Sequence, residues 1–219
     1  MSEEKRVFSC SDCTRYSCKA KKENEYPPFC LTAQVDHELL NETLDIYKND
    51  EEVKKIAITS ASIEGEFYCQ LTRVQETIEF IKRMGYKKVG IASCVGLMRE
   101  TSQFCKILRA EGIEYYTVGC KTGAVDKTEI GVPNEKKINH GCAHESMCNP
   151  IMQAKVLAAQ GCELNILIGL CVGHDTLFLR YSEAPTTVLV VKDRVLQNNP
   201  VLALYGVGSS YSRFKDLGL

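Results

Sequence analysis

The chain has 219 residues, of which 44% are hydrophobic, and its formal net charge is −1 at pH 7. This length and apolar content are enough for one globular domain with a small appendage, while the lack of a basic excess argues against nucleic acid as a partner. No apolar run approaches the roughly 20 residues that span a bilayer, and the N-terminal residues lack the apolar core of a signal peptide, so we expect a soluble, cytoplasmic protein that does not bind a membrane.

Twelve cysteines in such a chain need a chemical explanation. The cytosol keeps thiols reduced, and a core of this size does not need disulfides to hold it together. Metal ligation or thiol chemistry is therefore the better interpretation of the cysteines, and a metal ion or a small molecule is the expected ligand.

Four of the cysteines lie close to the N-terminus, in the stretches FSCSDCTRYSC and PPFC: Cys10, Cys13, Cys18 and Cys30. They offer four soft ligands, and the short spacing of the first two lets one turn present both sulfurs to the same ion. The segment has almost nothing apolar to pack, so metal binding would provide its folding energy. A redox role is less favoured, because no strand pattern precedes Cys10. We expect residues 1–35 to hold zinc or an iron-sulfur cluster.

Residues 36–219 are expected to form an α/β domain, because strand-like apolar runs alternate with amphipathic stretches from about Val53 onward. The predicted strands cover residues 53–60, 87–93, 113–119, 164–170 and 186–191. The predicted helices cover residues 69–84, 97–110 and 150–160. Asn149 is expected to cap the last of these helices, with Pro150 in its first position.

This order of elements predicts an open, doubly wound, mostly parallel sheet of about five strands, with a Rossmann-like or flavodoxin-like topology. Ligands of such sheets bind beyond the carboxyl ends of the strands. Residues 120–148 show little periodicity, and a segment of that length inside a compact domain is usually functional.

Cysteines stand where three of the predicted strands end. The runs IASCVGL and IGLCVGH finish in the same tripeptide and place Cys94 and Cys171 at strand ends, and VGCKTG places Cys120 at a third. Cys142 and Cys148, in GCAHESMC, lie in the loop that leads to the next helix. Strand ends and helix N-termini stabilise thiolates and bind substrates. We therefore expect these five cysteines to hold a cofactor, either an iron-sulfur cluster or another metal.

The other cysteines of this domain have a simpler interpretation. Cys69, Cys105 and Cys162 lie in or beside predicted helices. Free cysteine is among the most frequently buried residue types, so we expect these three to be small hydrophobic core residues.

Titratable residues accompany the strand-end cysteines. The candidates for acid or base catalysis are His174, Asp175 and Glu145. Asp175 could equally cap the start of a helix. Further charged residues near the strand ends are Arg99, Glu100, Lys121, His140, His144, Lys192 and Arg194. The last two are expected to be surface or core-capping residues, and the chain has no GxGxxG or Walker-type motif that would indicate a nucleotide.

Several long motifs, taken in order, resemble one known family: SCSDCTRYSC with PPFC, GIASCVGLMRET, GCAHESMCNPIMQA, LNILIGLCVGHDTLF and APTTVLVVKDRVLQNNPVLALY. That family is a group of uncharacterised microbial proteins, frequent in anaerobes, catalogued as a domain of unknown function and described as metal-binding. The resemblance covers nearly the whole chain. It implies that the four N-terminal cysteines are metal-ligand candidates and that the GLCVGHD segment is important, and it implies no particular activity.

Three functional hypotheses follow. In the first, the strand-end cysteines hold an iron-sulfur cluster or metal with an open position at which a small molecule reacts. In the second, the protein binds a metal or senses oxidation without catalysis. In the third, Cys171 and His174 perform thiol nucleophile chemistry.

Overall fold

The computed structural model of the protein describes residues 7–218, which divide into two compact units between Ser62 and Ile63. The first unit contains three short 3-10 turns, and its helices are α1 (His37–Asn49) and α2 (Glu51–Phe67), the second of which continues into the second unit. Asp36 begins α1, because its carboxylate accepts a hydrogen bond from the Glu38 N–H at 2.8 Å. The separate metal-binding segment expected in residues 1–35 remains a prediction.

The predicted first strand, residues 53–60, is wrong, because these residues lie in the middle of α2. Asp50 accepts hydrogen bonds from the N–H groups of Glu52 and Val53, both at 3.0 Å, and so begins the helix. The β-branched residues of this stretch favour strands in isolation. Here a capped N-terminus and an acidic first turn outweigh that preference.

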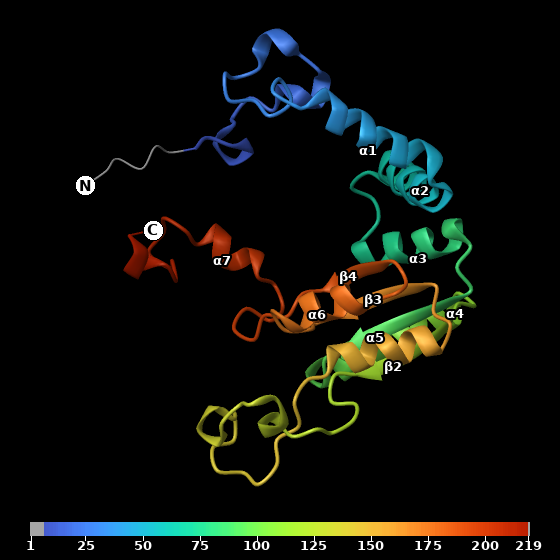
Figure 1. Ribbon diagram of the computed structural model, residues 1–219, viewed down its shortest axis with the longest axis vertical. Helices are drawn as coiled ribbons and strands as arrows, with labels where there is room; N and C mark the ends of the chain where they lie inside the picture. The colour runs from blue at the N-terminus through green and yellow to red at the C-terminus, as the bar shows by residue number, and fades with distance from the viewer. Residues whose placement is uncertain (1–6, 219) are drawn as a thin grey trace. The chain divides into compact units, whose positions relative to one another are not determined.

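The second unit is built on a four-stranded sheet, all parallel, in the order β2-β1-β3-β4 (Figure 1). The remaining elements are, in chain order, α3 (Arg73–Met84), β1 (Lys88–Ser93), α4 (Met98–Ala110), β2 (Glu114–Gly119), α5 (Pro150–Ala159), β3 (Leu164–Ile168), α6 (His174–Tyr181), β4 (Thr186–Val190) and α7 (Val201–Tyr205). The predicted fold class is therefore confirmed, with four strands instead of about five. None of the helices in residues 7–218 is long and apolar enough to cross a membrane.

Local sequence signals set the ends of these helices. α3 begins with a capping box in which Thr72 and Gln75 satisfy one another's backbone N–H groups. It ends at Gly85, whose φ of 75° is the left-handed conformation that closes a helix. α5 begins as predicted, because Asn149 caps a backbone N–H at 3.1 Å and Pro150 occupies the first helical position.

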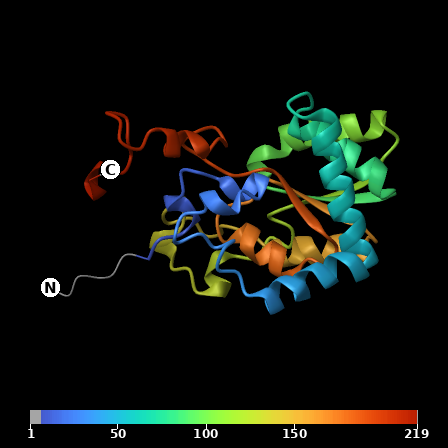
Figure 2. The ribbon, with the colours of Figure 1, turned by 90° about the horizontal axis from the view of Figure 1, so that it is seen from above.

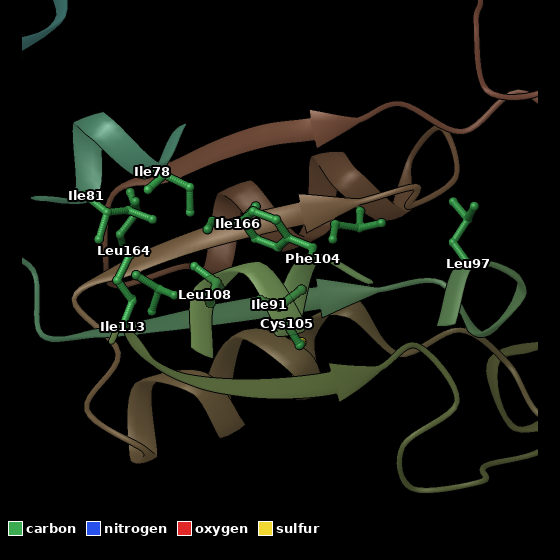
Figure 3. Packing of buried hydrophobic residues seen from close by; sticks show 12 residues of the cluster. Ile78, Ile81, Ile91, Leu97, Phe104, Cys105, Leu108, Ile113, Leu164 and Ile166 are labelled. Carbon is green, nitrogen blue, oxygen red and sulfur yellow. The ribbon is translucent and has the colours of Figure 1, made fainter. Parts of the chain in front are cut away.

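Two hydrophobic layers enclose the sheet. α3 and α4 cover one face, where Ile81 belongs to the same buried cluster as Ile91 of β1 (Figure 3). α5 and α6 lie next to one another on the opposite face, where Leu157 and Phe178 are fully buried (Figure 2). Each such buried side chain stabilises the fold by about 1.5–3 kcal/mol. Helices on both faces make this a doubly wound fold.

The three cysteines expected to be small core residues divide into two groups. Cys105 and Cys162 are buried, as expected. The expectation is wrong for Cys69, which is exposed. Its φ of 59° shows why: Cys69 lies in a turn after α2 and not in a helix that packs on the core.

The strand order contains a topological switch point between β1 and β3. The chain leaves β1 toward β2 on one side and later crosses to β3 on the other side, so the connections after β1 and β3 diverge. Leu97 lies beyond the end of β1 (Figure 3) and presses on Gly169, where an added Cβ would lie 1.9 Å from the Leu97 Cδ1. We call the edge of the sheet where the four strands end the carboxyl edge.

Candidate functional site

The structure brings together three of the five strand-end cysteines at the carboxyl edge. Cys94 follows β1, Cys120 follows β2, and Cys148 lies just before α5. The Sγ atoms of Cys120 and Cys148 are 3.8 Å apart, and the Cys120 side chain also hydrogen-bonds with that of Cys94. We call these three residues the thiol cluster.

Parallel strand pairing positions the thiol cluster. The Cys120 N–H donates to the Ser93 carbonyl at 2.9 Å, which places the end of β2 beside the end of β1. The Asn149 N–H donates to the Cys120 carbonyl at 2.7 Å and attaches the start of α5 to the same point. The Val95 N–H donates to the Cys120 Sγ at 3.4 Å. Cys94 of the β1–α4 connection and Cys120 and Cys148, from the two ends of the β2–α5 connection, are therefore close because of the register of the sheet.

The thiol cluster holds two acidic thiols around one that stays protonated. The hydrogen bond with Cys120 is the main cause that lowers the pKa of Cys94 to about 5, and the same is true of Cys148. The pKa of Cys120 is raised by its interactions with Cys148 and Cys94 and by burial, since only 2% of the residue is exposed. At neutral pH we therefore expect thiolates at positions 94 and 148.

Positive charges accompany both acidic thiols. The Lys192 ammonium group also lowers the pKa of Cys94. Lys121 and, after it, His174 do the same for Cys148. Sequence reasoning placed Lys192 at this edge of the sheet, directly after the last strand, but gave it no role at the cysteines.

A buried glutamine supports the ends of β1 and β2. Gln153 of α5 is fully buried, and its Nε2 donates to the carbonyl oxygens of Val118 at 2.7 Å and Ser93 at 3.1 Å. The Ser93 Oγ lies 2.6 Å from the Thr101 Oγ1 of α4. Because Ser93 directly precedes Cys94, this network fixes the backbone at the thiol cluster. Sequence reasoning missed Gln153, whose one signal is a polar residue inside an apolar helix.

The other two strand-end cysteines are not part of the thiol cluster. The Cys171 Sγ accepts a hydrogen bond from the Arg194 Nη2 at 2.9 Å. The His174 N–H donates to the Cys171 carbonyl at 2.8 Å, so these two residues share a turn, but the Cys171 sulfur is bonded to the arginine. Cys142 is half-buried, and its N–H donates to the Asn139 carbonyl at 3.2 Å. No hydrogen bond joins either sulfur to the thiol cluster in the described part of the chain.

The three predicted acid–base residues lie in different surroundings. His174 begins α6 near the thiol cluster, and its Nδ1 is buried with no hydrogen-bond partner among residues 7–218. Asp175 accepts a hydrogen bond from the Thr176 N–H at 2.8 Å, as a residue at a helix start does. Glu145 forms an ion pair with Lys127, which lowers the pKa of its carboxyl group. Of the three, His174 is the one whose side chain influences the pKa of Cys148.

An ionic network anchors the long connection that precedes α5. Lys137 has only 1% of its side chain exposed, and its Nζ lies 2.9 Å from the Asp126 carboxylate. Asp126 also accepts hydrogen bonds from the N–H groups of Thr128 at 2.9 Å and Glu145 at 2.6 Å. These bonds hold the pKa of Asp126 far below its usual range, and the bond from the Thr128 N–H has the largest effect. The connection is therefore an ordered structure that positions the residues before Cys148.

The four N-terminal cysteines lie on turns in the first unit. The Cys13 N–H donates to the Cys10 carbonyl at 3.2 Å, so one turn carries both residues. The pKa of Tyr26 is raised, first by burial and then by Glu23, Cys30 and Cys18. Both cysteines therefore lie near the Tyr26 side chain. Hydrogen bonds from the backbone lower the pKa of Cys30 itself. Cys10 and Cys13 therefore share a turn, and Cys18 and Cys30 both lie near Tyr26.

The arrangement of possible ligands bears on the predicted metals without deciding them. Phe8 stacks on Phe29 with ring centroids 5.5 Å apart, which joins the two stretches that carry the N-terminal cysteines. Across residues 7–218, however, no group of three or more His, Cys, Asp or Glu side chains is arranged so that it could hold a metal ion. The donor sets consist of thiols, which suit soft ions and iron-sulfur clusters. Zinc and iron-sulfur clusters therefore remain predictions at both places.

The fold and the thiol cluster define a class of protein, a doubly wound α/β domain with cysteines and cations at the carboxyl edge of its sheet. Residues 30–189 match the family described as protein of unknown function (DUF1847). An uncharacterized protein of Methanocaldococcus jannaschii is 44% identical over 198 residues, which are 90% of this chain and 94% of that relative. The chain therefore belongs to the DUF1847 family of unknown function, as its motifs indicated. The matched range contains the whole thiol cluster.

Proposed function

We propose that the protein binds a soft metal ion or an iron-sulfur cluster through the thiol cluster, and that a small molecule reacts at the position the three sulfurs leave open. The observation that carries this proposal is the 3.8 Å distance between the Sγ atoms of Cys120 and Cys148. Two thiolates on one tetrahedral zinc, each about 2.3 Å from the metal, are about 3.8 Å apart. This pair already has the spacing of two ligands, and Cys94 would complete the site by a movement of its side chain.

The surroundings of the thiol cluster support this proposal. Cys94 and Cys148 favour the thiolate form, which is the form that binds metals. Lys192 and Lys121 provide positive charge beside the two thiolates. His174 is near enough to hold or deliver a proton at the site. When bound, the metal or cluster would supply Lewis acidity or electron transfer.

We also propose a structural metal at the N-terminal cysteines. Two of them share one turn and the other two lie near Tyr26, which supports a site built from this segment. A metal that joined the pairs would hold a segment with almost no buried side chains. A cytoplasmic location belongs to the same proposal, because reduced thiols persist there.

Metal and acid-labile sulfide analysis of protein purified without oxygen tests the proposal. We expect Cys94→Ser and Cys148→Ser to lose the metal of the thiol cluster and to keep the metal of the N-terminal segment. Cys69→Ser is the matched control, because Cys69 is exposed and lies outside both sites. Unchanged metal content in both cluster variants would refute a metal site at the carboxyl edge.

Thiol chemistry without a metal is a second candidate, favoured by the acidic thiols and by the incomplete ligand group in the described chain. In this reaction the Cys148 thiolate would attack an electrophilic carbon, and His174 would protonate the leaving group. The candidate predicts that iodoacetamide alkylates Cys148 at pH 6 in protein without bound metal. A rate at pH 6 no faster than that of Cys69 would remove it.

A further inference from the structure

Gly96 is exposed and lies beside the sulfur of the buried Cys94. A Cβ built at Gly96 would lie 3.7 Å from the Cys94 Sγ and 3.7 Å from the Lys192 Nζ. The φ of Gly96 is not positive, so the backbone conformation does not itself require glycine. The missing side chain therefore leaves the buried Cys94 thiol and the Lys192 ammonium group side by side next to the exposed Gly96.

Three cations lie at the carboxyl edge without an acidic partner. Among residues 7–218, no carboxylate forms an ion pair with Lys121, Lys192 or Arg194. Asp193, which lies between Lys192 and Arg194 in the sequence, accepts from the Val195 N–H at 2.8 Å, and Asp175 in the first turn of α6 accepts from the Thr176 N–H. In the described part of the chain, Lys192 therefore has no ion-paired carboxylate that would compete with an added oxyanion.

We infer that the surface at Gly96 binds a small oxyanion, such as a carboxylate, through Lys192 and holds it against Cys94. The inference rests on the proposed function, because it names the ligand class of the same site. An ammonium group binds an oxyanion as a compact charge, and ligands of doubly wound sheets bind at the switch point, where Cys94 lies. Lys121 and Arg194 extend the positive surface to larger anions.

Alkylation by a charged and a neutral reagent tests the inference. Iodoacetate carries a carboxylate and iodoacetamide does not, and with each reagent a sulfur–carbon bond forms while iodide leaves. The ratio of the two rates at one cysteine cancels the fraction of thiolate at that cysteine, so it reports the attraction of the carboxylate alone. The rates are measured site by site by peptide mass spectrometry on the reduced, full-length protein after treatment with a chelator, with circular dichroism as the check of its fold.

We expect the ratio of iodoacetate to iodoacetamide rates at Cys94 to exceed the ratio at the exposed Cys69 by roughly fivefold, the effect of one adjacent cation. Lys192→Met should abolish this excess, and Gly96→Leu should reduce it by covering the approach. Lys106→Met removes an equal charge from the exposed side of α4 and should keep the excess. Equal ratios at Cys94 and Cys69, or an excess that survives Lys192→Met, would overturn the inference.

A second measurement uses the protein as purified, with any metal in place. At ten times the dissociation constant, sodium acetate should raise the unfolding midpoint by about 3 °C relative to sodium chloride at equal ionic strength. Lys106→Met should show the same shift and Lys192→Met none, and a wild-type protein that does not distinguish the salts would count against the inference. The two proposals fail separately, because metal content tests the metal site and the rate ratio tests the ligand class.

Discussion

Gln153 links the packing of α5 to the geometry of the thiol cluster, and replacing it by methionine tests that link. Methionine keeps the volume of the fully buried side chain and removes its hydrogen bonds to the carbonyl oxygens of Val118 and Ser93. Such a bond contributes about 1 kcal/mol net. The Ser93 carbonyl keeps the Cys120 N–H as a donor at 2.9 Å, so the loss falls mainly on Val118. We expect the free energy of unfolding to fall by about 1–2 kcal/mol.

Urea denaturation measures this change as a lower midpoint with an unchanged slope. Gln160→Met is the matched control, since Gln160 is exposed at the end of the same helix and should shift stability by no more than about 0.5 kcal/mol. In Gln153→Met the alkylation rate of Cys94 should also change, because the backbone before it has lost a support. Equal midpoints for the two variants would show that the buried hydrogen bonds do not hold the carboxyl edge.

Three further predictions concern other parts of the chain. Gly65→Ala should stabilise the protein by about 0.5–1 kcal/mol in thermal or urea unfolding, because Gly65 lies inside α2 and nothing is within 4 Å of an added Cβ; a loss of stability would contradict the helical assignment. Lys137→Met should lower the free energy of unfolding by about 3 kcal/mol, because it leaves the Asp126 carboxylate without its buried partner, and should increase amide hydrogen exchange in residues 121–147. Lys136→Met, at an exposed position, should change neither quantity. The pKa of Cys148 falls on folding from 9.0 to about 5, so the contribution of this thiol to stability is complete above pH 9 and is lost as the pH falls toward 5. The difference in unfolding free energy between the wild type and Cys148→Ser should therefore shrink from pH 9 to pH 5. A constant difference would contradict the lowered pKa.

The fold was largely predictable because its signals are local. Alternating apolar runs and capped, amphipathic helices defined β1 to β4 and α3 to α5 close to their observed ends, and Asn149 caps α5 as predicted. The error at residues 53–60 has a physical cause. Periodicity in a short stretch rich in β-branched residues does not separate a strand from a helix, and Asp50, which decides the matter, lies outside that stretch.

The sequence predicted where the candidate site lies, but not which of the cysteines contact one another there. Strand-end cysteines were expected to meet, and Cys94, Cys120 and Cys148 do meet. Which cysteines contact one another depends on side-chain direction and on register, which no spacing in the sequence records. Cys171 therefore binds Arg194 instead, and Cys142 stays within its loop. The position of Lys192 after β4 places it at the carboxyl edge, but its contact with Cys94 depends on side-chain direction and register, which the sequence does not show.

The order of the strands explains why this site needs residues that are far apart in the chain. β1 lies between β2 and β3, so connections from both neighbours can meet at its end. Cys94 comes from β1 and Cys120 from β2, while the long connection returns Cys148 to the same point before α5 carries the chain to β3. A site built from two connections, one of which contributes a cysteine at each end, forms only when the strands have paired in their native register. The thiol cluster should therefore report the folded state: in a strand-register error or in the unfolded chain, Cys148 loses Cys120 and with it the main cause of its acidity.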